Sequence, residues 1–222
     1  MKGHAPAIAA DEEYIPLKDQ SIDLVVASLC LQWVNDLPGT LVQIRRALRP
    51  DGLFLAALPG GETLSELRQA LMVAETELSG GAGPRVLPFV DVRDVGGLLQ
   101  RAGFALPVTD QDTLVARYDD LWALMRDLRA MGATNILADR DRRPVARAVF
   151  DRAAAIYRER FSDPDGRIRA TFQIVSASGW APHESQQKPL KPGSAKTRLA
   201  EALGTDEISA GEAAPGGGRQ NP

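Results

Sequence analysis

Two short apolar runs separated by one amphipathic segment constrain the fold of this chain more than any other feature. Ile22 to Ala27 and Leu53 to Leu58 are mostly apolar and bounded by polar residues, which is typical of parallel strands buried on both faces. Asn35 or Asp36 is expected to cap a helix between them. Its apolar stripe consists of Leu37, Leu41, Ile44 and Leu48. Strand, helix and strand in this order predict a βαβ unit with a right-handed crossover.

Apolar positions at helical spacing indicate four further helices. One is expected to begin at a capping box made by Thr63 and Glu66, in which each side chain bonds the other's backbone. Another is expected to be capped by Asp91 and to end near Gly103. The predicted helices cover residues 63–79, 91–103, 121–131 and 144–161.

Period-two alternation predicts an antiparallel strand near the end of the ordered chain. From Arg167 to Val175, the apolar residues alternate with polar ones, as in a strand with one exposed face. Thr113 to Tyr118 is predicted to be a further strand, and Ala7 to Ala10 resembles the end of an earlier one. From Gly204 onward there is hardly any large apolar residue, so a disordered tail is expected.

Composition excludes several classes of function. The net charge of −3 over 222 residues gives no electrostatic basis for nucleic-acid binding. One cysteine and two histidines exclude an intramolecular disulfide and argue against a metal site. No apolar run approaches the roughly 20 residues of a membrane span, and the first residues lack a signal-peptide core. A cytoplasmic location is therefore expected.

Asp11 to Leu17, followed by Ser21 to Leu29, resembles the middle of a class I S-adenosylmethionine-dependent methyltransferase. The resemblance implies an α/β fold whose family sheet has the strand order 3-2-1-4-5-7-6. Only the second half of that fold is expected here, a partial sheet lacking strands 1 and 2. Residues 1–182 would form this partial domain, with cap helices inserted at about 62–79 and 120–161. Residues 183–222 would form an extended, disordered tail.

The closest resemblance is to the mitochondrial complex I assembly factors, a branch associated with hydroxylation of an arginine. The segments that carry it are Leu31 to Pro38, Gly60 to Leu64, Arg101 to Phe104 and Gly179 to Gln186. The resemblance implies action on a quinone-module subunit of the respiratory NADH dehydrogenase. Arginine hydroxylation also needs an oxidant, and no iron-binding triad is legible. Two alternatives remain: an enzyme like the biotin-pathway malonyl-thioester O-methyltransferase, and a non-catalytic assembly chaperone.

The resemblance also implies where the cofactor S-adenosylmethionine would bind. Asp11 occupies the position whose carboxylate accepts a hydrogen bond from the adenine amino group, and Glu12 would offer its backbone N–H to the ring. Ser28 and Leu29 follow the first buried strand, where open α/β sheets bind ligands. The family's glycine-rich loop and ribose-binding acid have no counterpart in the residues before Asp11. We therefore expect weak cofactor binding, or none.

Five residues are candidates for substrate contact, although each also has a structural interpretation. Gln32 and Trp33 would face the reactive methyl group, but Trp33 is equally a candidate core aromatic. Arg68 would bind a carboxylate or form an ion pair within its helix. Trp180 and His183 belong to the branch signature and would either contact substrate or anchor the tail. No catalytic residue is assigned, and no metal site is expected.

Overall fold

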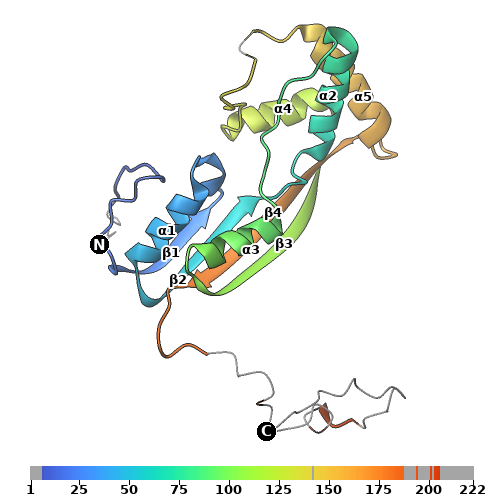
Figure 1. Ribbon diagram of the computed structural model, residues 1–222. Helices are drawn as coiled ribbons and strands as arrows, with labels where there is room; N and C mark the ends of the chain where they lie inside the picture. The colour runs from blue at the N-terminus through green and yellow to red at the C-terminus, as the bar shows by residue number, and fades with distance from the viewer. Residues whose placement is uncertain (1–6, 142, 188–193, 195–200, 202, 206–222) are drawn as a thin grey trace, which may run out of the picture. The chain divides into compact units, whose positions relative to one another are not determined.

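The computed structural model describes residues 7–141, 143–187, 194, 201 and 203–205 (Figure 1). The chain divides into two compact units, Met1–Glu184 and Ser185–Pro222. Every helix and strand discussed below belongs to the first unit. The predicted tail lies almost entirely outside the described residues. None of the helices that the structure describes has both the length and the apolarity needed to cross a bilayer.

A mixed four-stranded sheet forms the base of the first unit. Its strands are β1 (Ile22–Ser28), β2 (Leu48–Pro59), β3 (Ala105–Tyr118) and β4 (Ile168–Trp180). They lie in the order β1-β2-β4-β3, with β1 parallel to β2 and the other pairs antiparallel. The predicted parallel βαβ unit is confirmed. The order also matches the last four strands, 4-5-7-6, of the expected family sheet.

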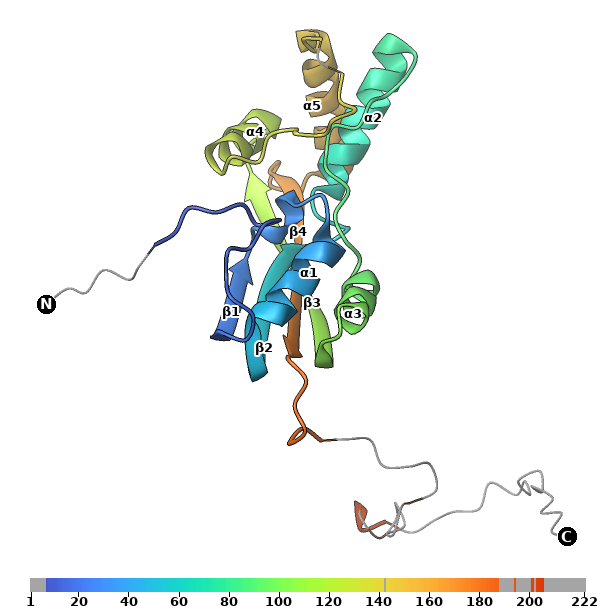
Figure 2. The ribbon, with the colours of Figure 1, turned by 60° about the vertical axis from the view of Figure 1, so that its left-hand side comes forward.

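Six helical elements accompany the sheet. They are η1 (Leu31–Trp33), α1 (Leu37–Ala47), α2 (Ser65–Ser79), α3 (Val92–Arg101), α4 (Leu121–Ala130) and α5 (Arg147–Phe161). Helices α1 and α3 cover one face of the sheet, as Figures 1 and 2 show. Their apolar stripes pack with Phe54 and Val175 into one hydrophobic core. Asp36 and Asp91 cap α1 and α3 through their carboxylates, as predicted.

Helices α2, α4 and α5 form a cap with a second core of its own (Figure 2). Strand β4 contributes to both cores. Ile168 and Ala170, in its first half, belong to the cap core, whereas Val175 and Ala177 belong to the sheet core. Strands β3 and β4 pair along almost their whole length, and the continuous strand β4 connects the two cores covalently.

The predicted capping box at the start of α2 is wrong. The residue before α2 is Leu64, which makes no side-chain cap and has a φ of 56°. The Thr63 hydroxyl instead donates to the carbonyl oxygen of Gln173, 2.9 Å away. The Glu66 carboxylate accepts from the backbone N–H of Thr171 at 3.1 Å. Both side chains hold β4 against α2, a long-range pairing that overrides the local motif.

The predicted alternation of the last strand is correct only for its first residues. Ile168 and Ala170 are buried, but Gln173 is also buried, and Phe172 is only half-buried. The pattern shifts because β4 runs between two neighbours and passes from the cap to the sheet. Strand β3 also begins eight residues before the predicted Thr113. Ala7 to Ala10, expected to end a strand, has no regular structure.

The sheet face opposite α1 and α3 carries an exposed apolar row. Val26 pairs with Leu55, and both Leu55 and Val108 pair with Ser178, so these residues lie on one face across all four strands. Val26 and Val108 are each 62% exposed. Because β1 also lies at an edge of the described sheet, we expect this row to promote self-association.

Val26→Lys is expected to reduce self-association of the purified protein, because it places a charge in the middle of this row. Light scattering during a concentration series measures the effect. Val25→Lys is the matched control: Val25 packs against the sheet core, so its replacement should destabilise the fold instead. Undiminished scattering by a folded Val26→Lys protein would exclude the row as the source of association.

Tyr157 makes the stability of the cap sensitive to alkaline pH. Its hydroxyl donates to the carbonyl oxygen of Arg169 at 2.7 Å. Burial, followed by the nearby charge of Glu66, raises the pKa of Tyr157 well above its usual range. The phenol therefore stabilises the folded state fully below the unfolded pKa of about 10. That contribution is lost progressively at higher pH, because only the unfolded chain then releases the proton.

Tyr157→Phe is expected to flatten the fall in unfolding free energy between about pH 9 and 11. It should cost about 1 kcal/mol near neutrality, through the lost hydrogen bond. Urea titrations at several pH values measure both effects. Tyr14→Phe, at an exposed position, should leave the pH profile unchanged. Parallel profiles for the Tyr157→Phe and unmodified proteins would contradict the assignment.

Candidate functional site

A groove of about 470 Å³ lies beside the carboxyl half of β1. Three parts of the chain form its walls: the segment over residues 8–17, the end of β1, and the buried face of α1. The carboxyl end of a parallel strand is where open α/β sheets place their ligands. Asp11 and Glu12, predicted as cofactor residues, both line this groove.

Hydrogen bonds from Gln43 hold the groove segment against α1. The Gln43 side-chain amide donates to the carbonyl oxygen of Glu13 at 2.7 Å, and its oxygen accepts from the backbone N–H of Ile15 at 3.1 Å. The Glu13 carboxylate accepts from both the backbone and the side chain of Asn35. These contacts fix the short segment that carries Asp11 at the rim of the groove.

The groove combines apolar walls with a few polar groups. One carboxylate oxygen of Asp11 accepts from the Glu13 backbone N–H at 2.9 Å; among the described residues, none donates to the other oxygen. The Thr40 hydroxyl is buried without a hydrogen-bond partner in the part of the chain that the structure describes. Burial, and then the charge of Glu12, raises the pKa of the Cys30 thiol, which keeps it neutral. These groups fit a flat, mostly apolar ring that carries an amino group.

Four other predicted residues lie at or just after the end of β1. Ser28 is the last residue of the strand, and Leu29 leaves it with a φ of 53° while donating to the carbonyl oxygen of Ala57. The Gln32 side chain donates to the carbonyl oxygen of Leu29 at 2.7 Å. Trp33 follows in η1 and is partly exposed. The Gln32 side chain therefore stabilises the end of β1 through this hydrogen bond.

Arg68 has a structural partner in the loop before α2. Its guanidinium donates to the carbonyl oxygens of Gly61 and Thr63, at 3.2 and 3.3 Å. An ion pair within its helix is not among the interactions found for Arg68 in the described chain, and its contact with a substrate carboxylate stays a prediction. Its observed role is to fix the turn that joins β2 to the cap.

Trp180 and His183 lie away from the groove. Trp180 pairs with Leu53, at the start of the parallel segment of β2, whereas Ser28 pairs with Ala57 at its end. Four residues of strand separate the two positions by roughly 13 Å. Because His183 follows Trp180 at this opposite end, the structure does not bring these two residues together with Ser28 and Leu29.

Sequence reasoning missed two groove residues, Cys30 and Thr40, and also Gln43, which holds the groove segment. Helical spacing offered a signal for Thr40, because it lies four residues before Ile44 on the same buried face of α1. Cys30 directly follows the predicted strand end. No local signal identifies Gln43, since its partners Glu13 and Ile15 lie about thirty residues earlier in the chain.

Gln43→Ala is expected to loosen the groove segment without unfolding the protein. The amide of Ile15 loses its acceptor, so its hydrogen exchange should accelerate roughly fivefold for a loss of about 1 kcal/mol. Exchange measured by mass spectrometry over residues 11–17 tests this. Gln69→Ala, at an exposed site on α2, is the control. Unchanged exchange in Gln43→Ala would show that the clamp does not hold the segment.

Comparison with known proteins finds several proteins that are similar to this chain. The family model described as a methyltransferase domain matches residues 2–56. The mitochondrial arginine-hydroxylase NDUFAF5 of Danio rerio is 45% identical over 197 residues, which are 89% of this chain and 61% of that protein. The malonyl-(acyl-carrier protein) O-methyltransferase of Xylella fastidiosa is 41% identical over 79% of this chain and 57% of its own length.

The chain thus spans about three fifths of the length of these curated relatives. Among solved structures, the YcgJ protein of Bacillus subtilis covers 78% of this chain and 70% of its own, with 14% identity and a TM-score of 0.48. A likeness this distant supports no argument.

Proposed function

We propose that the chain is a methyltransferase-family protein whose groove holds the adenine half of S-adenosylmethionine. The observation that carries this proposal is the placement of Asp11 and Glu12 on an otherwise apolar groove at the carboxyl end of β1. The carboxylate oxygen of Asp11 that accepts no described hydrogen bond would accept one from the adenine amino group. The backbone N–H of Glu12 would donate to the ring, and Val25 and Ile15 would pack against its faces.

The rest of the cofactor would extend toward Ser28, Leu29 and Gln32. S-adenosylmethionine supplies an activated methyl group on its sulfonium. The protein's contribution is therefore to position the acceptor and exclude water. None of the described groove residues provides a glycine-rich loop or an acid for the ribose. The proposal predicts weak affinity for the cofactor, because the described groove holds only its adenine half.

We further propose that the chain acts on a protein substrate during assembly of the respiratory NADH dehydrogenase. Support comes from the 45% identity to the arginine-hydroxylase NDUFAF5, maintained over 89% of this chain. The expected partner is a quinone-module subunit of that enzyme. NDUFAF5 is named as mitochondrial, whereas the sequence alone favours the cytoplasm, so the location of this chain stays a prediction.

A second candidate function is methylation of a malonyl thioester. The 41% identity to the malonyl-(acyl-carrier protein) O-methyltransferase favours it, although that match is weaker and shorter than the first. Transfer of a labelled methyl group to malonyl-acyl-carrier protein, with formation of an ester, would support this alternative. The same assay without product would favour the assembly function.

Cofactor binding is tested by NMR titration with S-adenosylmethionine. We expect saturable shifts confined to residues 11–17 and the end of β1, with a dissociation constant near about 1 mM. Asp11→Asn should weaken binding by tenfold or more, because a hydrogen bond to a charged acceptor contributes about 1.5–3 kcal/mol. Asp94→Asn, on the exposed side of α3, is the matched control. Shifts elsewhere, or an unaffected Asp11→Asn protein, would contradict the proposed groove.

Partner binding is tested separately, by capture of the purified quinone-module subunit with and without S-adenosylmethionine. Capture that requires the cofactor supports an enzyme acting on this subunit. Capture that is independent of the cofactor supports the non-catalytic chaperone. Failure to capture the subunit under either condition contradicts the proposed partner while leaving the cofactor experiment intact.

A further inference from the structure

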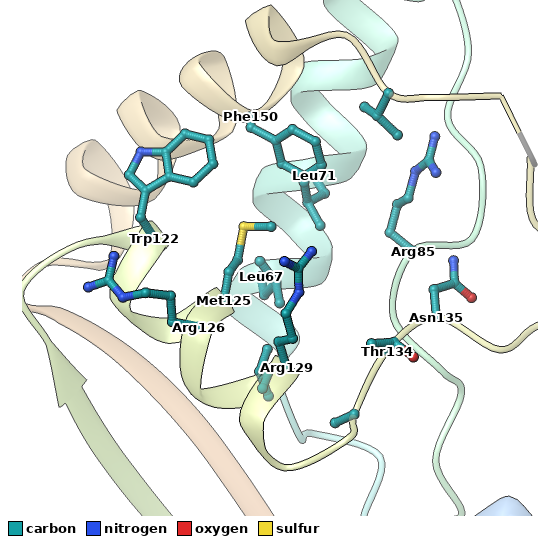
Figure 3. A pocket seen from close by; sticks show the side chains of 13 residues that line it. Leu67, Leu71, Arg85, Trp122, Met125, Arg126, Arg129, Thr134, Asn135 and Phe150 are labelled. Atoms are coloured by element: carbon teal, nitrogen blue, oxygen red, sulfur yellow. The ribbon is translucent and has the colours of Figure 1, made fainter.

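A second cavity, of about 440 Å³, lies in the cap among α2, α4 and α5 (Figure 3). None of the residues that line it lines the cofactor groove. Its volume falls within the range of sites that bind small molecules. The cavity is therefore a separate candidate site, which the proposed cofactor chemistry does not use.

The floor of this cavity is apolar and comes from three helices. Leu67 and Leu71 extend from α2, Met125 from α4 and Phe150 from α5 (Figure 3). Trp122 closes one end, where its ring lies 6.0 Å from that of Phe150 with the two planes tilted by 50°. Aliphatic, thioether and aromatic groups together suit an alkyl chain, because Met and Leu side chains adapt to its shape.

Positive charge gathers at the mouth of the cavity. Arg126 and Arg129 lie three residues apart on α4, and both line the cavity. Figure 3 shows Arg129 extending beside Met125, while Arg126 lies next to Trp122. Neither guanidinium has an ion pair or side-chain hydrogen bond within the described chain. A third arginine, Arg85, is already paired with Glu75.

No acidic side chain is among the described residues that line the cavity. Two guanidiniums therefore stand over an apolar floor with no protein carboxylate to neutralise them. A guanidinium binds a carboxylate through parallel N–H···O bonds, and the geometry favours oxyanions over neutral groups. The two arginines and the apolar floor of the cavity together favour a ligand with one anionic end and one apolar end.

We propose that the cap cavity binds a small amphipathic carboxylate, with its alkyl chain on Leu71, Met125 and Phe150 and its carboxylate at Arg126 and Arg129. The proposal goes beyond the cofactor groove and does not depend on it. A cation of the same shape would be repelled by the two arginines. A neutral alcohol would fill the floor but leave both guanidiniums without an anionic partner.

The test is calorimetric titration of the full chain with dodecanoate, 1-dodecanol and dodecylammonium, each below its micelle concentration. Dodecanoate should bind in the micromolar range and quench tryptophan fluorescence, because Trp122 borders the cavity. Dodecanol should bind about tenfold more weakly or worse, and dodecylammonium not at all. Equal affinity for the three compounds, or no binding of dodecanoate, would overturn the proposal.

Two variants at the cavity and one control variant on α3 locate the site. Arg126→Ala combined with Arg129→Ala should weaken dodecanoate binding by about tenfold or more. Arg93→Ala combined with Arg101→Ala removes the same charge from α3, outside the cavity, and should have no effect. Ala133→Phe keeps both arginines but fills the space, so it should also abolish binding. Thermal unfolding of each variant checks its fold.

If both double variants lose the same affinity for dodecanoate, the loss would come from the changed net charge alone. That result would contradict the proposed site. An acidic peptide of alternating leucine and glutamate serves as a competing probe. Tighter binding of this peptide than of dodecanoate, lost in the α4 double variant, would also overturn the proposal, because the natural occupant would then be a protein segment. S-adenosylmethionine titration of the α4 double variant should match the unmodified protein, since the groove is untouched.

Discussion

Phe54→Ala is expected to lower the free energy of unfolding by about 3–5 kcal/mol, which is a large part of the stability of a small domain. Phe54 is fully buried in β2 and stacks on Phe104, with ring centroids 5.3 Å apart. Removing the ring leaves a cavity between the sheet and α3 that the neighbouring backbone cannot fill. Urea denaturation followed by circular dichroism measures the loss.

The matched control is the next residue of the same strand. Leu55 points to the opposite face of the sheet and is 38% exposed, so Leu55→Ala should cost far less than Phe54→Ala. Similar losses at the two positions would mean that both faces of β2 are covered. That result would contradict the one-sided packing by α1 and α3.

Glu75→Ala is expected to be the second most damaging change, at about 3 kcal/mol or more. The Glu75 side chain is 6% exposed and forms an ion pair with Arg85, which is 18% exposed. The carboxylate also accepts from the backbone N–H of Gly83 at 3.0 Å. Its removal leaves a largely buried guanidinium and a backbone donor without partners. The loop after α2 should then lose its anchor.

A double-mutant cycle separates the interaction energy of the Glu75–Arg85 ion pair from the contribution of each residue alone. If the cost of Glu75→Ala comes mainly from the stranded charge of Arg85, then Glu75→Ala combined with Arg85→Leu should recover much of it. Glu77→Ala provides the comparison, because Glu77 pairs with Arg152 on the surface. Its melting temperature should hardly change. Additive losses in the buried cycle would show that the two residues stabilise the cap independently.

The parts of the fold that could be predicted from sequence are those fixed by neighbouring residues. Asp36 and Asp91 cap their helices because a carboxylate reaches backbone donors within the next three residues. The parallel pairing of β1 and β2 follows from two apolar runs joined by one helix. These local rules correctly predicted the parallel pair of strands and the caps of the two helices that cover the sheet.

The errors arise where distant segments compete with a local motif. Thr63 and Glu66 have the spacing of a capping box, but β4, more than one hundred residues later, takes both side chains. The same strand buries Gln173, which no alternation pattern anticipates. Local spacing cannot reveal these contacts, because the partner segment is specified only by the tertiary fold.

The residues of the candidate site also divide into those that the sequence predicted and those that depend on long-range contacts. Asp11 and Glu12 were found through the family resemblance, and they do line a groove. Gln43 was missed because its hydrogen bonds join segments about thirty residues apart. Trp180 and His183 were grouped with the substrate residues from a sequence signature alone. The register of β4 against β2 places them at the other end of the sheet.

Strand β4 has a consequence for how this protein is made. It is the last strand along the described chain, yet it completes both the cap core and the sheet core. During translation, all five α-helices emerge from the ribosome before this strand. Folding is therefore expected to finish only after residues 168–180 have been synthesised. The nascent polypeptide should depend on holding chaperones throughout that interval.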